Sequence, residues 1–306
     1  MILPSPRWLP LLRELGDLKR VRSAGQHGSV AERLFALSWR RLVAGEETVS
    51  VARDITARAL VATRLGDVDG ECLAAAGLPT EAVQAGLLRA FSSAAAGVDG
   101  PAQAWLCGTP EGVPLYEQAD PGPTVATPDF VGRLARQPRA GATAPGMPRV
   151  MFDPTESHAE HCLCVAVAGV LLAPAEGADV GHVFLASLAH HLHNALLPDS
   201  GFAGEMMLGE LLAPAMAGAT ALALGELPPE LSHRVTEACR ILPDAQTPEG
   251  RAFHAADTLD RVLQMEHHLR AGGTSMAFLQ NEMALVHEGP VKPFQVALLR
   301  EMGLAA

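Results

Sequence analysis

The sequence predicts an all-α protein. Apolar residues recur every three or four positions along most of the 306-residue chain, which is the spacing of one face of a helix. Two S-x-x-E capping boxes, Ser29 with Glu32 and Ser157 with Glu160, mark helix starts. No stretch alternates apolar and polar residues as a strand would. Because 48% of the residues are apolar but only 4% are aromatic, aliphatic side chains must build the core.

In the first half of the chain, the predicted helices follow one another closely. Leucines at positions 9, 12, 15 and 18 share one face of a helix expected over residues 5–22. Further helices are expected over residues 30–44, 48–66 and 80–95. Residues 97–128 are rich in Gly, Pro and Asp and lose the helical period, so we expect a linker or an irregular excursion there.

The second half contains a run of predicted helices, and several begin with proline at or near the first helical position, where proline is favoured. A short helix precedes a broken stretch at residues 141–148. The helices expected after it span residues 158–172, 180–197, 204–223, 229–241, 248–271, 274–287 and 293–302.

Charge and histidine are distributed unevenly between the two halves. Residues 1–150 hold 16 Lys/Arg and 15 Asp/Glu, whereas residues 151–306 hold 7 and 19, a net charge of −12. Eleven of the twelve histidines lie at or after His158, and only His27 precedes it. An acidic surface repels polyanions, so we expect no nucleic acid partner. A region rich in nitrogen and oxygen ligands suits a metal cation instead.

The remaining composition points to a soluble cytoplasmic protein. Five cysteines are an odd number and imply no disulfide framework, which favours a reducing compartment. The longest apolar run, residues 162–173, is 12 residues long, short of the roughly 18 that a membrane span needs. The N-terminal segment has two prolines and early charges rather than the apolar region of a signal peptide. We therefore expect no membrane partner.

Three predicted helices carry candidate metal ligands. The first has His161, with His158 one turn earlier; the second has the tandem pair His190 and His191, followed by His193; the third has His254 and Asp257. Most single histidines are ordinary surface or core groups, and we assign His182, His233, His267, His268 and His287 to that class. Three imidazoles within four residues would repel one another if ionised, so a metal or a careful set of hydrogen bonds is needed at 190–193.

These segments resemble a known family. EHCLCVAVAGVLLA (160–173), LASLAHHLHNA (185–195) and TPEGRAFHAADTLDRVLQ (247–264) resemble the three core segments of the HD-domain superfamily of metal-dependent phosphohydrolases. They look most like the branch of deoxyribonucleoside 5′-monophosphatases. The resemblance implies an HD-like helical bundle whose metal ligands are His161, His190, His191 and Asp257. It also implies hydrolysis of a small phosphorylated metabolite or nucleotide.

Two positions depart from the family pattern. The Asp of the HD pair is His191 here, and the usual Glu further on is Asn194. A carboxylate can bridge two metals and a neutral imidazole cannot, so we expect one divalent ion, of Mn, Co, Fe, Zn or Ni. An iron oxygenase of the HD fold is one alternative, to which His193 could contribute a ligand. A non-catalytic metal-binding or regulatory protein is the other.

For the hydrolase, the resemblance leaves the proton acceptor and the phosphate contacts to be assigned. Glu160 and Asp199 are the candidate catalytic carboxylates, and His158, His193 and His254 are further candidate ligands. Arg251 and Arg261 flank Asp257 on its helix and are the candidate phosphate contacts. Lys and Arg are scarce in this half, so the first half is expected to supply side chains if the substrate is a nucleotide. The substrate is expected to be a small anion, and a homodimer is allowed.

The first half contains a fainter copy of the same pattern. Residues 12–39 resemble the lead-in and first core helix of an HD domain, with Arg33 where the metal-binding His would lie. Residues 59–67 resemble the HD segment, with Thr63 and Arg64 in place of His and Asp. We therefore expect a degenerate HD-like lobe over residues 1–122 and a metal-binding lobe over residues 123–306. The two arginines would bind an anion or form ion pairs.

Overall fold

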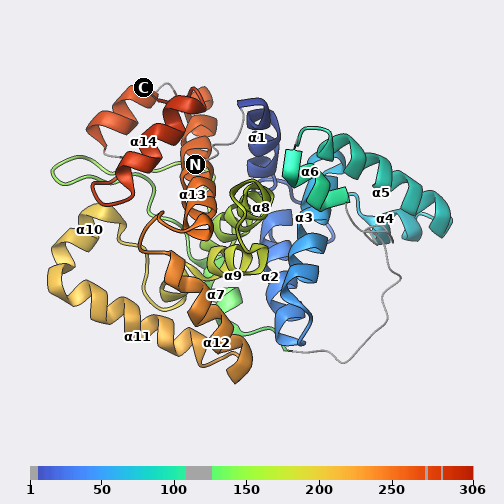
Figure 1. Cartoon of the computed structure of the whole chain (residues 1–306), viewed down its shortest axis with the longest axis horizontal. Coiled ribbons are helices and arrows are strands. Elements are labelled where there is room, and N and C mark those ends of the chain that lie inside the picture. The colour runs from blue at the N-terminus through green and yellow to red at the C-terminus, as the bar shows by residue number, and fades with distance from the viewer. Residues whose placement is uncertain (1–5, 99, 108–125, 273–274, 284, 306) are drawn as a thin grey trace.

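The described part of the chain is helical, as the sequence predicts. A computed structural model describes residues 6–98, 100–107, 126–272, 275–283 and 285–305 (Figure 1). Within these ranges there is no strand, and the extended pairings are two isolated antiparallel bridges, Pro138 with Ser157 and Ala142 with Val150. The all-α prediction is therefore confirmed.

The first half forms six α-helices. After a 3-10 turn at Pro6–Trp8 they are α1 Leu9–Asp17, α2 Val30–Val43, α3 Thr48–Leu65, α4 Gly70–Ala75, α5 Thr80–Ala95 and α6 Gly100–Cys107. Helix α6 lies inside the stretch 97–128 that we expected to be irregular, so that prediction is wrong for residues 100–107. Helix α6 packs on α8 and buries Leu106, and this tertiary contact outweighs the local Gly and Pro content. Residues 108–125 of the same stretch lie outside the described residues.

The second half forms eight α-helices in the described ranges. They are α7 Asp129–Arg136, α8 His158–Glu176, α9 Val180–Ala189, α10 Gly201–Leu208, α11 Leu212–Leu224, α12 Pro229–Ala238, α13 Pro248–Gly272 and α14 Lys292–Glu301.

Three predicted helices of this half are shorter or divided in the structure. The helix expected over 180–197 ends at Ala189 and continues as a 3-10 turn, Leu192–Ala195. The helix expected over 204–223 divides at Gly209, whose φ of 52° ends α10. Of residues 274–287, the described helical part is a π-helical turn, Phe278–Glu282.

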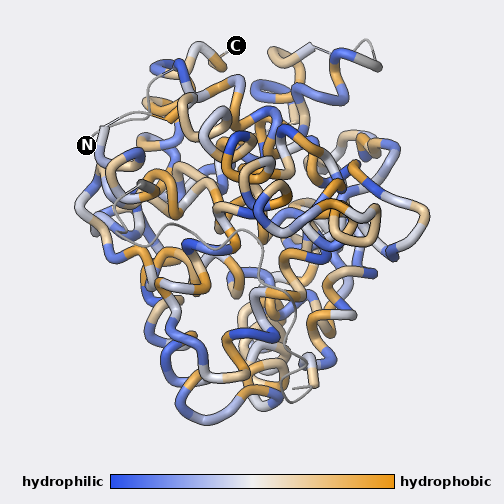
Figure 2. The backbone as a smooth tube through the Cα atoms, turned by 90° about the vertical axis from the view of Figure 1, so that its right-hand side faces the viewer, coloured by the Kyte–Doolittle hydropathy of each residue, from blue (hydrophilic) through white to orange (hydrophobic). Residues whose placement is uncertain are grey.

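Helix α8 is the central element of the molecule (Figure 1). It is apolar on all faces, the pattern of a helix that is buried all round, and it packs against α2, α9 and α13. Figure 2 shows apolar and polar stretches alternating along much of the backbone tube. Helices α8, α9 and α13 carry the predicted metal ligands, so their mutual packing sets the geometry of the site.

Two helical segments are long and apolar enough to pass a length and hydropathy test for membrane spans. The first, His158–Glu176, is 89% buried inside the molecule, as expected for a core helix. The second, Gly201–Leu224, is only 11% buried, and Met207 and Leu211 are 90% and 69% exposed. Helices α10 and α11 therefore present a large apolar surface to the solvent.

Close packing of α8 on α9 depends on a glycine. A Cβ added at Gly169 would lie 2.8 Å from Val183 Cγ1 and 3.3 Å from Ser187 Oγ. We therefore expect Gly169→Ala to destabilise the protein by about 1–3 kcal/mol through overpacking, although alanine favours helix by roughly 1 kcal/mol. Gly218→Ala in exposed α11, where no atom lies within 4 Å, should stabilise instead. Urea denaturation of both variants measures this, and equal shifts of the same sign would contradict it.

The two halves share one core and meet at matching helix starts. Trp39 of α2 and Phe130 of α7 are fully buried and pack edge to face at 4.9 Å. Both predicted capping boxes are present, and Ser157 Oγ donates to Glu32 Oε1 across the two boxes at 3.2 Å. The proposed duplication and its boundaries stay a prediction.

In the faint copy, the two arginines are ion-paired rather than free. Arg33 pairs with Asp67, and Arg64 pairs with Glu14 at 2.5 Å. The Thr63 hydroxyl donates to the carbonyl of Leu60 in its own helix. These contacts correspond to the ion-pair alternative for this region.

Candidate metal centre

His161 is fixed by the start of α8. Ser157 caps the helix by accepting the Glu160 backbone N–H, and the Glu160 carboxylate accepts the Ser157 N–H in return. This places His161 in the first helical turn, where its side chain is fully buried. Its Nδ1–H donates to Asp260 Oδ2 at 2.7 Å, which leaves Nε2 facing Asp257.

The tandem histidines lie where α9 ends. His190 follows the last α-helical residue, and His191 has φ −111° and ψ 20°, outside helical geometry. This break lets both rings turn toward α8, with centroids 5.1 Å and 5.2 Å from the His161 ring. A continuous helix would instead separate adjacent side chains by about 100° around its axis.

Hydrogen bonds fix the tautomer of each of these rings. His190 Nδ1 lies 2.7 Å from the Ser187 carbonyl oxygen, which can only accept, so Nδ1 carries the proton. His191 Nδ1–H donates to Asn194 Oδ1 at 2.8 Å, while the Asn194 amide donates to the Leu197 carbonyl. In the neutral state, Nε2 of His161, His190 and His191 therefore carries no proton, and its lone pair is available to a metal.

These nitrogens converge with a carboxylate of α13. His161 Nε2 lies 3.1 Å from His190 Nε2 and 3.2 Å from Asp257 Oδ1, and His190 Nε2 lies 4.0 Å from the same oxygen. Ligand atoms of all three histidines lie within 4.8 Å of one another. Ligands bonded at about 2.0–2.1 Å to one metal lie about 3.0–3.4 Å apart. Converging acceptors are stable only with a cation among them, a metal ion or a proton, so the residues fit a metal.

The electrostatics keep these groups in the metal-binding form. Burial, with the charge of His161 adding to it, lowers the pKa of His190 to about 3, and burial also lowers the pKa of His191 well below its ordinary value. Burial alone would raise the pKa of Asp257, but its contact with His161 and the charge of Arg261 outweigh burial and lower that pKa. At neutral pH the imidazoles of His190 and His191 are therefore neutral and the Asp257 carboxylate is ionised, as metal binding requires.

The three further candidate ligands lie at different depths around this cluster. His158 is fully buried, its ring lies 4.6 Å from His191, and neither of its nitrogens has a hydrogen-bond partner among the residues described. His193 packs 5.6 Å from His191. His254 lies one turn before Asp257 on α13, near the backbone of Leu242 and Asp244. His158 therefore lies against the cluster, whereas His254 faces the segment between α12 and α13.

The two candidate catalytic carboxylates lie in different environments. Glu160 completes the α8 capping box, and its other oxygen lies 3.4 Å from Arg22. Asp199 accepts the backbone N–H groups of Ala140 and Gly201, and its Oδ2 lies 3.7 Å from His158 Nε2. Asp199 therefore borders the histidine cluster, whereas Glu160 is held at the helix start.

The two candidate phosphate contacts, Arg251 and Arg261, also lie in different environments. Arg251 pairs with Glu176 at 2.6 Å and donates to the Gln246 carbonyl, so its charge is engaged at the far end of α8. Arg261, one turn after Asp257, has two buried guanidinium nitrogens without a hydrogen-bond partner in the described ranges. Burial lowers the pKa of Arg261, and the charge of Asp257 partly offsets this.

Four residues of the centre were not predicted from the sequence. Arg139 lies with one guanidinium nitrogen 3.4 Å from His191 Nε2, and Glu156 lies 3.5 Å from Arg139 Nε. Lys19 pairs with Glu156 and Asp260. Asp260 was detectable, since it follows Asp257 by three positions on the same helix. Lys19 comes from a turn and Arg139 from the irregular segment after α7, where no periodicity marks them.

Comparison with known proteins supports the assignment of the core segments. No curated protein and no solved structure shows a significant match to the chain. A family model described as the HD domain matches residues 131–289, just over half of the 306 residues. The matched range includes α8, α9 and α13 with His161, His190, His191 and Asp257, and the HD domain suggests the superfamily of metal-dependent phosphohydrolases. The chain therefore belongs to the HD domain family.

Proposed function

We propose that this protein is a metal-dependent phosphohydrolase that removes phosphate from a small phosphorylated metabolite or nucleotide. The observation that carries the proposal is the convergence of the His161 and His190 Nε2 atoms with the Asp257 carboxylate, with a ligand atom of His191 within 4.8 Å of those of the other two histidines. Three nitrogens and one oxygen suit a divalent ion of Mn, Co, Fe, Zn or Ni. Within the superfamily, the deoxyribonucleoside 5′-monophosphatase branch is the one that we favour.

The chain supplies the ligands, a proton acceptor and substrate contacts. His161, His190, His191 and Asp257 would hold one ion, which when bound polarises a phosphoryl oxygen and lowers the pKa of a bound water. Of the two candidate carboxylates, we assign proton transfer to Asp199, since it borders the cluster beside His158. Glu160 is engaged by its helix cap and Arg22.

Two arginines near the cluster are suited to bind the phosphate. Arg139 and Arg261 are close enough to influence each other electrostatically, and Asp257 acts on both. Burial disfavours the charge of Arg139, but Glu156, Asp257 and Asp199 outweigh it and raise its pKa. The unpartnered nitrogens of Arg261 are donors that a phosphate oxygen would satisfy. The substrate would therefore be anionic.

Arg261 and Arg251 provide a matched pair of variants. We expect Arg261→Met to raise the KM for a phosphorylated substrate about tenfold or more, because a charge-assisted hydrogen bond is lost. Arg251→Met removes an arginine of the same helix whose charge is paired with Glu176, and its KM should stay near that of the wild type. Steady-state kinetics decides this, and an equal KM change in the two variants would remove Arg261 from the substrate site.

Elemental analysis followed by a substrate panel tests the function. Purified protein should contain one transition metal ion per chain and release phosphate from phosphomonoesters when loaded with Mn, Co, Mg or Fe in turn. Protein without stoichiometric metal, or loaded protein inactive on the whole panel, would contradict the proposal. The second outcome would leave a non-catalytic metal-binding protein.

An iron oxygenase of the HD fold is the second candidate, and a specific observation favours it. The rings of His161, His190 and His191 contact one another and the His158 ring packs on His191, where a hydrolase pattern would place a carboxylate at position 191. Iron content with oxygen uptake, rather than phosphate release, would identify this activity.

The cytoplasmic location and the homodimer expected from the sequence stay predictions. The exposed apolar surface of α10 and α11 offers the area that a second copy of the chain would need.

A further inference from the structure

A lysine from the first half of the chain is buried beside the metal centre. Lys19 lies in the turn after α1, 241 positions before Asp260, and its side chain is 2% exposed. Its Nζ lies 2.5 Å from Glu156 Oε1 and 2.7 Å and 2.8 Å from the two oxygens of Asp260. The two carboxylates compensate the charge of the buried ammonium, and the ammonium compensates their negative charges.

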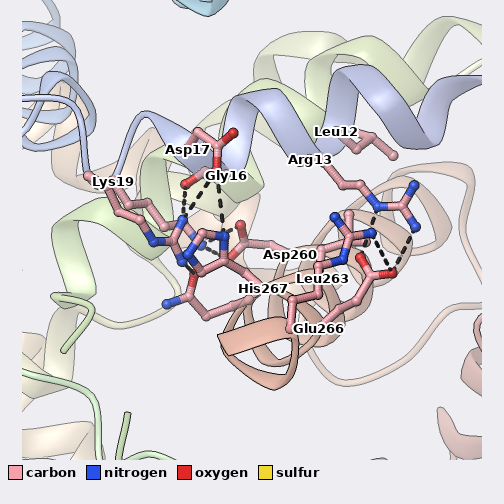
Figure 3. A pocket seen from close by; sticks show the side chains of 12 residues that line it. Leu12, Arg13, Gly16, Asp17, Lys19, Asp260, Leu263, Glu266 and His267 are labelled. Atoms are coloured by element: carbon pink, nitrogen blue, oxygen red, sulfur yellow. Dashed lines mark hydrogen bonds and ion pairs between the residues drawn. The ribbon is translucent and has the colours of Figure 1, made fainter. Parts of the chain in front are cut away.

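Further contacts join α1 and the turn after it to α13 beside Lys19. Arg13 binds both oxygens of Glu266 at 2.9 Å and 2.8 Å, and Arg20 donates to Gln264 Oε1 at 2.7 Å. Asp260 and Gln264 lie on the face of α13 toward α1, whereas Asp257 faces the metal ligands. The two helices line a pocket of about 390 Å³ with Lys19 and Asp260 in its wall (Figure 3).

Asp260 connects this ion pair to a metal ligand. The same Oδ2 that lies 2.8 Å from Lys19 Nζ accepts the Nδ1–H of His161 at 2.7 Å. A carboxylate that receives the Nδ1–H of a ligating histidine fixes both the tautomer and the ring orientation. Lys19 holds both oxygens of Asp260 in place, so its effect reaches Nε2 of His161 without direct contact.

The ammonium also explains a second cluster with metal-ligand spacing. Glu156, His161 and Asp260 have donor atoms within 4.8 Å of one another. Lys19 Nζ already contacts both carboxylates, and His161 Nδ1 carries the proton of its hydrogen bond. The positive charge in this cluster is therefore provided by the chain itself.

We propose that Lys19 and Asp260 are positioning residues for His161, through which the ammonium of Lys19 sets the metal affinity of the centre. The inference rests on the metal site of the proposed function. It assigns to the first half of the chain a role at a site whose ligands all lie in the second half.

Three variants separate the charge of Lys19 from the docking of α1. We expect Lys19→Met to weaken cobalt binding about 10–100-fold, the usual effect of losing an outer partner of a metal ligand, and to alter the absorption spectrum of the bound cobalt. Lys19→Arg should retain most of the affinity, since it keeps the charge. Arg13→Met breaks a neighbouring α1–α13 ion pair that does not contact Asp260, and it should bind cobalt as the wild type does.

The pocket permits chemical rescue. In Lys19→Ala, propylammonium replaces the missing part of the side chain and can enter beside Asp260. We expect it to restore cobalt affinity, whereas propanol at the same concentration should not. If Lys19→Met does not fold, withdrawing propylammonium from Lys19→Ala gives the same comparison.

A measurement on metal-free protein distinguishes this inference from the proposed function. The ¹⁵N chemical shifts of His161 in metal-free protein should show the Nδ1–H tautomer in the wild type and Lys19→Arg, and a mixture in Lys19→Met. Wild-type protein that binds no metal would contradict the proposed function, but the tautomer would still decide the role of Lys19. An unchanged tautomer with unchanged cobalt affinity in Lys19→Met, or an equal loss in Arg13→Met, would overturn the inference.

Discussion

His190→Ala and Asp257→Ala are each expected to abolish stoichiometric metal binding. Each variant removes one of the atoms that converge on His161 Nε2 at 3.1 Å and 3.2 Å. Loss of an outer partner of a metal ligand costs about 10–100-fold in affinity, and loss of the ligand itself should cost more. Metal analysis after gel filtration, together with cobalt titration, measures the effect.

The control for this prediction lies on the same helix as His190. His182 of α9 is half exposed and pairs with Asp179 at 3.1 Å, away from the cluster. His182→Ala should therefore keep the full metal content, with the same circular dichroism as the two site variants. Full metal content in His190→Ala or Asp257→Ala would place the ion elsewhere and remove the basis of the hydrolase proposal.

Trp39→Ala is expected to give the largest loss of stability, about 3–5 kcal/mol in the free energy of unfolding. The Trp39 side chain is fully buried between two rings: its ring centroid lies 6.3 Å from that of Phe35 and 4.9 Å from that of Phe130. Because Trp39 lies in the predicted lobe over residues 1–122 and Phe130 in that over residues 123–306, the cavity would weaken the core between these two parts of the chain. Urea denaturation followed by circular dichroism gives the free energy.

Trp39→Phe is the matched control. It keeps a ring against Phe130 and removes the Nε1–H, which is buried without a hydrogen-bond partner in the described structure. We expect a change below about 1.5 kcal/mol, as for substitutions that nearly conserve volume. Equal losses for the alanine and phenylalanine variants would show that packing of this ring does not stabilise the core.

Local sequence patterns predicted the helices and much of the metal centre. The helix at Thr80–Ala95 matches its prediction at both ends, and both capping boxes form as expected. These features depend on residues close together in the chain, so their physics is visible in the sequence. The order of His161, the tandem histidines and Asp257 was likewise sufficient to recognise the family.

Features that depend on distant contacts were not predicted. Helix α6 forms within a Gly- and Pro-rich stretch because α8 provides a surface for it. The break after Ala189 turns His190 and His191 toward one centre, although the local pattern favours a longer helix. Neither the pairing of Arg251 with Glu176 nor the burial of Arg261 can be inferred from their similar positions around Asp257.

The sequence by itself determined the fold class, the histidine-rich half and the four converging residues, since each follows from composition, helical period or short motifs. Only the tertiary structure decided which groups surround them. Lys19 and Asp260 are 241 positions apart and meet because α1 packs on α13, and Arg139 reaches His191 from the irregular segment after α7. The free energy of a buried charge depends on the partners that the fold brings to it, and no local pattern in the sequence records those partners.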